Sequence, residues 1–122
     1  MKHEAEKDRT TQLETLGTGT PLVLIGGSDR GLQAFPYQLP LAEEGYQLIA
    51  RVPRSELPES VDFEEEASRL NEVLPHQALH VVGHSWGGLT ALHLAALRAE
   101  NIGSLLLIEP AAMSVANDEP SC

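Results

Sequence analysis

The sequence predicts an α/β protein with three layers (α/β/α), in which helices cover a mostly parallel sheet. Short apolar runs of strand length alternate along the chain with segments of helical periodicity, which is typical of parallel βαβ units. Two of the runs, Leu22–Ile25 and Leu105–Ile108, are apolar at every position, as expected for strands buried on both faces. We expect one domain over residues 12–110, flanked by flexible tails at residues 1–11 and 111–122.

Glycine and proline mark where the elements begin and end. Gly17 and Gly19 predict a turn before the first buried strand. Pro36 and Pro40 interrupt an otherwise helical pattern, so that segment is expected to be helical only in part, and Gly45 ends it. The expected elements, in chain order, are an edge strand at 12–16, a strand at 22–26, a partly helical segment at 32–44, a strand at 46–52, a helix at 61–74, a strand at 79–83, a helix at 89–100 and a strand at 104–108.

The segment from Val61 to Leu74 predicts an amphipathic helix. Its apolar residues recur at helical spacing, and its acidic start suits the positive end of a helix dipole. We expect the carboxylates of Glu64, Glu65 and Glu66 to form a solvated face. The next predicted helix is rich in alanine, which lets a helix lie close to a sheet.

A serine stands at the apex of a strand, a tight turn and a helix. The strand at 79–83 runs directly into Gly-His-Ser-Trp-Gly-Gly. Such a turn needs small neighbours, because strand and helix must approach closely while the serine takes a strained conformation. It would expose the hydroxyl of Ser85 and leave the Trp86 amide free to donate to an oxyanion. The other residues of this elbow are Gly83, His84, Gly87 and Gly88.

At this elbow the chain resembles the α/β-hydrolase family, and the resemblance extends from about Gly17 to Pro110. Residues 17–27 (GTGTPLVLIGG) look like the strand and loop that supply a second oxyanion amide. Residues 39–50 (LPLAEEGYQLIA) resemble the following helix and strand, and residues 104–110 (SLLLIEP) resemble the strand after the nucleophile helix. The resemblance implies a parallel core in the order 46–52, 22–26, 79–83, 104–108.

The resemblance also implies a reaction, the transfer of an acyl group from an ester-like small molecule to water. Ser85 would be the nucleophile, the Trp86 amide one oxyanion donor, and the amide of Gly27 or Ser28 the other. Only the N-terminal half of the family's fold is covered, because the chain is truncated after the strand that follows the nucleophile helix. We therefore expect an incomplete serine hydrolase, without metal or cofactor.

No histidine of the sequence is placed to act as the base that Ser85 needs. His93 is eight residues along the helix, roughly 12 Å away by helical rise. His80 is five residues back along the strand, about 16 Å away. The others are excluded by lying in the tail, by still greater distance or by pointing to the opposite face: His3, His76 and His84 respectively. The catalytic acid is less clearly absent, since Glu109 follows the last strand, where some family members carry it.

Two other functions stay open from the sequence. Without a base, the chain could be a hydrolase-like module that binds an acyl ligand or a partner and performs no catalysis. The loop Gly26–Gln33 (GGSDRGLQ) also resembles the nucleotide loop of short-chain dehydrogenases, with Arg51 and Arg54 placed to hold the 2′-phosphate of NADP. The chain contains no YxxxK pair for hydride chemistry, so this alternative is the weaker one.

The amino-acid composition limits the kinds of binding partner and the cellular compartment that we expect for the chain. The net charge of −10 argues against binding to nucleic acid or anionic membranes. A single cysteine excludes an internal disulfide, which fits a reducing cytoplasm. The apolar run at 105–108 has no later strand to cover it, so we expect a sheet edge that associates with a second copy or another chain.

Overall fold

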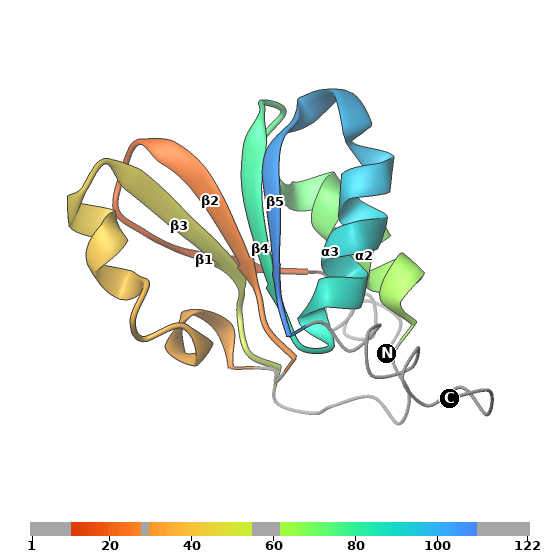
Figure 1. Cartoon of the computed structure of the whole chain (residues 1–122), viewed down its shortest axis with the longest axis horizontal. Helices are drawn as coiled ribbons and strands as arrows, with labels where there is room; N and C mark the ends of the chain where they lie inside the picture. The colour runs from red at the N-terminus through yellow and green to blue at the C-terminus, as the bar shows by residue number, and fades with distance from the viewer. Residues whose placement is uncertain (1–10, 28–29, 55–61, 110–122) are drawn as a thin grey trace, which may run out of the picture.

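Five strands form one twisted sheet in the computed structural model, which describes residues 11–27, 30–54 and 62–109 (Figure 1). The expected order of the parallel core is confirmed, and the short N-terminal strand pairs antiparallel at one edge. In the sheet order β1-β3-β2-β4-β5, the strands are β1 (Leu13–Leu16), β3 (Tyr46–Arg51), β2 (Thr20–Ile25), β4 (Leu79–His84) and β5 (Ile102–Ile108).

Helical segments lie on both sides of this sheet, which confirms the three-layer arrangement (Figure 1). The segment expected to be partly helical, 32–44, forms two short 3-10 helices and no α-helix. Prolines 36 and 40 remove backbone donors there, so a longer helix cannot form. Within the described residues, the two α-helices, α2 (Phe63–Val73) and α3 (Gly87–Leu97), pack on one face. The 3-10 helices η1 (Gly31–Ala34) and η2 (Leu39–Glu43) pack on the other, and η3 (Ala99–Asn101) follows α3.

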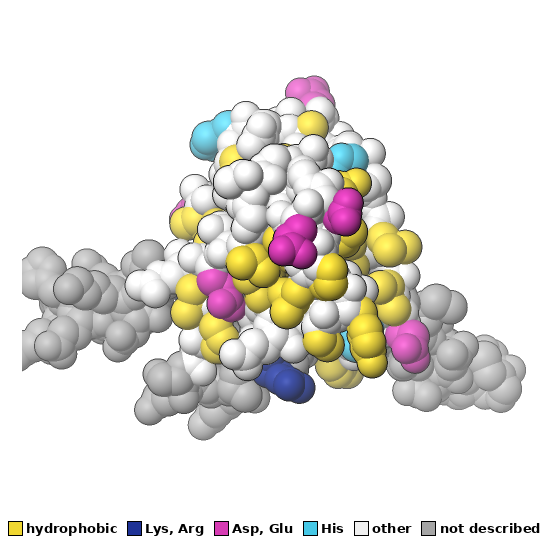
Figure 2. Space-filling view, turned by 90° about the vertical axis from the view of Figure 1, so that its left-hand side faces the viewer, with side chains coloured by type: hydrophobic (Ala, Val, Ile, Leu, Met, Phe, Trp, Pro, Cys, Tyr) yellow, Lys and Arg dark blue, Asp and Glu magenta, His cyan; other side chains and the backbone are white. Residues whose placement is uncertain are grey.

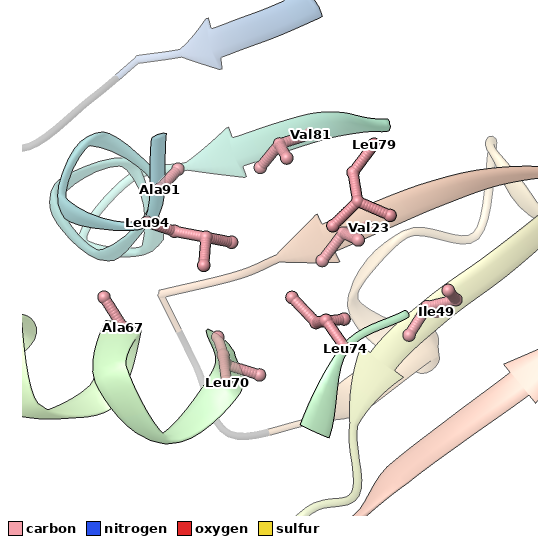
Figure 3. Close-up of a cluster of buried hydrophobic side chains, with 9 residues drawn as sticks. All are labelled: Val23, Ile49, Ala67, Leu70, Leu74, Leu79, Val81, Ala91 and Leu94. Carbon is pink, nitrogen blue, oxygen red and sulfur yellow. The ribbon is translucent and has the colours of Figure 1, made fainter. Parts of the chain in front are cut away.

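The larger core cluster lies between the sheet and helices α2 and α3 (Figure 3). Alternate strand residues project to the same face, so β2, β3 and β4 all contribute side chains to it. Full burial of one such aliphatic side chain stabilises the fold by about 1.5–3 kcal/mol. The cluster therefore fixes α3, and with it the start of that helix, against the sheet. Its members are Val23, Ile49, Ala67, Leu70, Leu74, Leu79, Val81, Ala91 and Leu94.

The opposite face of the sheet is covered unevenly. A second cluster, containing Leu48 and Phe35, lies beneath η1 and η2, over strands β2 and β3. Over β4 and β5, Leu106 pairs with Val82 across the sheet and is 55% exposed. Figure 2 shows hydrophobic side chains gathered on this side of the molecule. Among the described strands, β5 is the outer one beyond β4, as expected from the sequence.

The boundaries of α2 and α3 follow from their caps. Asp62 caps α2, with its Oδ1 accepting from the Glu65 amide at 3.0 Å. Helix α3 begins at Gly87, two residues before the expected start at residue 89, because the serine turn passes directly into it. It ends at Leu97, and η3 completes the expected segment.

Buried Arg98, just after α3, holds the loop that leads into β4. Its guanidinium donates to Asn71 Oδ1 at 3.1 Å, to the Gln77 carbonyl at 3.2 Å and to the Pro75 carbonyl. Desolvation by burial lowers the pKa of Arg98 from its ordinary value. These bonds satisfy loop carbonyls and so fix the entry into β4, the strand that ends at the serine turn.

Candidate active site

Ser85 occupies a strained turn between β4 and α3. Its φ of 58° lies in the left-handed region that residues with a side chain seldom adopt. The Ser85 amide donates to the Ile108 carbonyl at 3.0 Å, and the Ser85 carbonyl accepts from the Gly88 amide at 2.9 Å. Two neighbouring elements therefore hold the backbone conformation that the sequence pattern predicts for this serine.

The turn requires glycine on both sides of Ser85, at positions 83 and 87. A Cβ at Gly87 would lie 2.2 Å from the Ile25 carbonyl oxygen, and one at Gly83 would lie 2.7 Å from Ala91 Cβ. Contacts this short with backbone or with a core residue cannot be relieved by rotating a side chain. The two glycines thus let α3 lie directly against β2 and β4.

Gly27 lies beside the serine hydroxyl and the first amide of the turn. A Cβ on Gly27 would be 3.1 Å from the Trp86 amide nitrogen and 3.3 Å from Ser85 Oγ. Trp86 caps α3, and within the described part of the chain its amide donates no hydrogen bond. The loop after β2 and the start of α3 therefore meet next to the hydroxyl, where a carbonyl oxygen would have to sit. Ser28, the other expected donor, lies outside the described residues.

Glu109 directly follows β5 and has the other positive φ among the described non-glycine residues, 45°. It is exposed, and its predecessor Ile108 is the residue that accepts from the Ser85 amide. Glu109 and the serine turn therefore lie at the same end of the sheet, where the parallel strands β4 and β5 reach their C-terminal residues. It gives this carboxylate no described hydrogen-bond partner.

The described histidines lie on β4, in α3 and in the loop before β4. His80 is bonded to Ser104 of β5, with 2.7 Å between Nδ1 and Oγ, and so contacts a different serine. His93 is an exposed residue inside α3, and His84 is the exposed last residue of β4. His76 is exposed in the loop before β4. No described histidine forms a hydrogen bond to Ser85.

A cavity of about 550 Å³ opens beside the serine turn. Its walls come from β1, from strands β2 and β3 toward their C-terminal ends, from α2 and from the start of α3. Gly27 and Trp86 line it, so it adjoins two of the residues that the sequence predicts as oxyanion donors. Apolar side chains make up much of the remaining wall, among them Leu13, Val23, Ile25, Phe63 and Leu70.

Two features of the cavity wall were not expected from the sequence. The ring of Phe63 stacks on that of Trp86, with centroids 5.9 Å apart and an interplanar angle of 7°. Glu66, expected on a solvated face, is only 16% exposed and forms ion pairs with Arg51 at 2.8 Å and with Arg54 at 2.7 Å. Helical spacing already places Phe63 and Glu66 on related faces, but it cannot show which strand ends lie opposite them.

Arg51 also contacts residue 11, the last residue of the expected N-terminal tail. Thr11 is buried, and its Oγ1 accepts from Arg51 Nη2 at 3.4 Å.

The described residues contain no cluster of three His, Cys, Asp or Glu side chains that could hold a metal ion. Of the helices they form, none has the length and apolar character needed to cross a membrane.

Sequence comparison matches the chain to known hydrolases. A family described as "alpha/beta hydrolase fold" matches residues 21–121. The lipase LipV of Mycobacterium tuberculosis (strain ATCC 25618 / H37Rv) is 55% identical over 31 residues, which are 25% of this chain and 12% of the lipase. The sequence match to this curated relative is thus short.

Structural comparison extends the match across most of the chain. The esterase EaEST from Exiguobacterium antarcticum is 30% identical, with a TM-score of 0.71, over 84% of this chain and 42% of the esterase. The epoxide hydrolase CorEH is 26% identical, with a TM-score of 0.68, over 82% of this chain and 38% of that protein. The chain thus spans less than half the length of these two structures.

Proposed function

The chain belongs to the α/β-hydrolase fold family, and from this premise we propose that it carries the nucleophile half of a serine ester hydrolase. Ser85 attacks the ester carbonyl, and the amides of Trp86 and Gly27 donate to the oxyanion that forms. The observation that carries the proposal is the meeting of Gly27, Ser85 and the Trp86 amide at one strained turn. The names of the relatives, an esterase and a lipase, support an ester substrate.

The base that accepts the proton from Ser85 is supplied, in this proposal, by polypeptide outside the given sequence. Support comes from the hydrogen bond of His80 to Ser104 and from the share of the related structures that the chain covers. Glu109 is the candidate acid that orients such a histidine. A cytoplasmic setting is part of the same proposal, and the single cysteine supports it.

Chemical rescue tests the missing base directly. Added imidazole should accelerate the labelling of Ser85 by a fluorophosphonate, because it can accept the serine proton while the two amides stabilise the developing charge. General bases contribute about 10²–10⁴ in rate when positioned, so a rise of about tenfold is expected from a base in solution. Mass spectrometry of the labelled peptides measures the rate at each serine.

Ser104 is the internal control for this experiment, because it is exposed and hydrogen-bonded to a histidine but lies within strand β5 and not at a strand–helix turn. Its labelling should respond little to imidazole. Equal, imidazole-independent labelling at Ser85 and Ser104 would contradict the nucleophile assignment. It would instead favour a hydrolase-like module that binds a ligand or partner without catalysis.

Self-association through β5 is a second expected property. An outer strand offers unpaired backbone groups, and Leu106 adds an exposed apolar side chain beside them. Light scattering at micromolar concentration should show a dimer or larger species, and Leu106→Lys should shift it toward monomer. Leu92→Lys is the matched control, since Leu92 is exposed on α3 and not on the strand. A monomer at all concentrations would refute the association.

A further inference from the structure

We propose that the cavity beside Ser85 binds an uncharged alkyl chain of the ester, from its acyl or its alcohol part, and that Phe63 determines how strongly the chain is held. The inference rests on the proposed function for the position of the ester group. It concerns the part of the substrate that does not react. Three observations carry it: a wall made partly of core side chains, two stacked rings, and charged neighbours that are already engaged.

Part of the cavity wall belongs to the hydrophobic core. Val23 and Leu70 line the cavity and are members of the larger core cluster, and Leu24 lines it from the second cluster. Their exposed fractions are 1%, 4% and 2% respectively. Closely packed core side chains keep their positions, so this apolar surface is present before a ligand arrives. The cavity volume of about 550 Å³ lies within the range of cavities that bind small molecules.

Phe63 and Trp86 form the aromatic part of the same wall. Asp62 caps α2, so the helix begins at Phe63 and holds that side chain at its first position. The Phe63 ring stacks on the Trp86 ring, and the stacking keeps Trp86 in one orientation. Trp86 is nevertheless 49% exposed, so a large apolar surface stays in contact with water. An alkyl chain that covers this surface gains the free energy of removing it from water.

The charged side chains of the wall do not call for a charged ligand. Of the described residues that line the cavity, Arg51, Arg54 and Glu66 are the charged ones. Both arginines pair with Glu66, at 2.8 and 2.7 Å, and each takes part in a further interaction, so neither guanidinium is free. A carboxylate on the ligand would lose its hydration without gaining an unengaged cation, whereas a methylene chain leaves these pairs intact.

The chain enters the cavity at the serine turn. A Cβ on Gly27 would lie 3.3 Å from Ser85 Oγ, and Gly27 and Trp86 both line the cavity. An ester group at Ser85 therefore adjoins the cavity, and one of its two chains extends along the Trp86 ring. Burial of one methylene group strengthens binding about fourfold, so the affinity should rise with chain length until the cavity is filled.

Binding to the Ser85→Ala variant measures this preference without turnover. The methyl esters of acetate, butyrate, hexanoate and octanoate form one series, and ethyl, butyl and hexyl acetate form the other. Trp86 is the sole tryptophan of the chain, so its fluorescence reports a ligand at this wall. In at least one series we expect Kd to fall about fifteenfold for every two added methylenes. Monomethyl suberate, which matches methyl octanoate in acyl length but ends in a carboxylate, should bind about tenfold more weakly than that ester.

Variants of Phe63 on the same background locate the site. Phe63→Ala should weaken the binding of the longest ester about tenfold, and Phe63→Leu, which keeps an apolar side chain, should retain most of the affinity. Leu92→Ala is the matched control, because Leu92 is an exposed apolar residue of α3 and is not among the described residues that line the cavity. It should leave the affinity unchanged.

Three results would overturn the inference: no binding of any ester, an affinity independent of chain length in both series, or equal affinity for monomethyl suberate and methyl octanoate. Unchanged affinity in a folded Phe63→Ala variant would refute the role of Phe63. The chain-length series requires no change at Phe63, so it decides the matter even if Phe63→Ala does not fold. Because every variant lacks the Ser85 hydroxyl, these results do not depend on whether Ser85 is a nucleophile.

Discussion

Replacing Gly87 with alanine is expected to destabilise the chain by about 3 kcal/mol or more, since the added Cβ would meet backbone in a packed region. That Cβ would lie 2.2 Å from the Ile25 carbonyl oxygen and 2.8 Å from the carbonyl carbon of Gly26. Neither atom can move without separating α3 from β2. A domain of this size has about 5–15 kcal/mol of total stability, so the loss should be plain in urea or thermal unfolding.

Gly103→Ala is the control for this substitution. Its Cβ would meet the ring of His80 at 2.9 Å, and that ring is the movable end of a side chain. We expect a change below about 1 kcal/mol for this variant. If Gly87→Ala unfolds with the same midpoint as the parent chain, α3 does not lie against β2 as described.

The second large expected effect is that of Ser85→Ala on the rate of ester hydrolysis. The isolated chain should hydrolyse p-nitrophenyl acetate slowly, and Ser85→Ala should lower the rate by no more than roughly 10³, the acceleration that remains when triad members are lost. The physical reason is that the proposed oxyanion donors stabilise the developing charge but do not remove the serine proton. Initial rates at several enzyme concentrations, corrected for buffer hydrolysis, measure the difference.

Ser104→Ala and His80→Ala separate this activity from reaction at the surface. An exposed imidazole can itself attack an activated ester, and His80 with Ser104 is the described serine–histidine pair. Both variants should retain the Ser85-dependent part of the rate. A fall well beyond 10³ in Ser85→Ala would mean that a base does reach Ser85, and the proposed absence of one would be wrong.

The elements that the sequence predicted best are those whose signal is local. Each parallel strand was recognisable as an apolar run, and α2 as a periodic segment with an acidic start, because burial and helix polarity act on neighbouring residues. The secondary structure of the segment at 32–44 was harder to predict. Its apolar residues suit a helix, but two prolines limit it to single turns, and only the folded chain shows the resulting pair of 3-10 helices.

The residues of the candidate site also differ in how far a local sequence pattern predicts them. Gly83, Ser85 and Gly87 were recognisable together, since they lie in one strand–turn–helix and their spacing carries the steric requirement. The sequence also placed Gly27 at the C-terminal end of a parallel strand, where ligands of such sheets gather. Its approach to Ser85 Oγ depends on the pairing of β2 with β4, which aligns Ile25 with Gly83.

By itself, then, the sequence determined the serine turn and the apolar runs of the parallel strands, because each depends on short-range sterics or on local composition, whereas the order of those strands was implied by the resemblance to the α/β-hydrolase family. The tertiary structure alone decided that Phe63 stacks on Trp86 and that Glu66 joins Arg51 and Arg54 in a cavity wall. These contacts join the first turn of α2 to β3 and to the start of α3. Their formation depends on how helices dock on the sheet, a property of side-chain packing that no local pattern encodes.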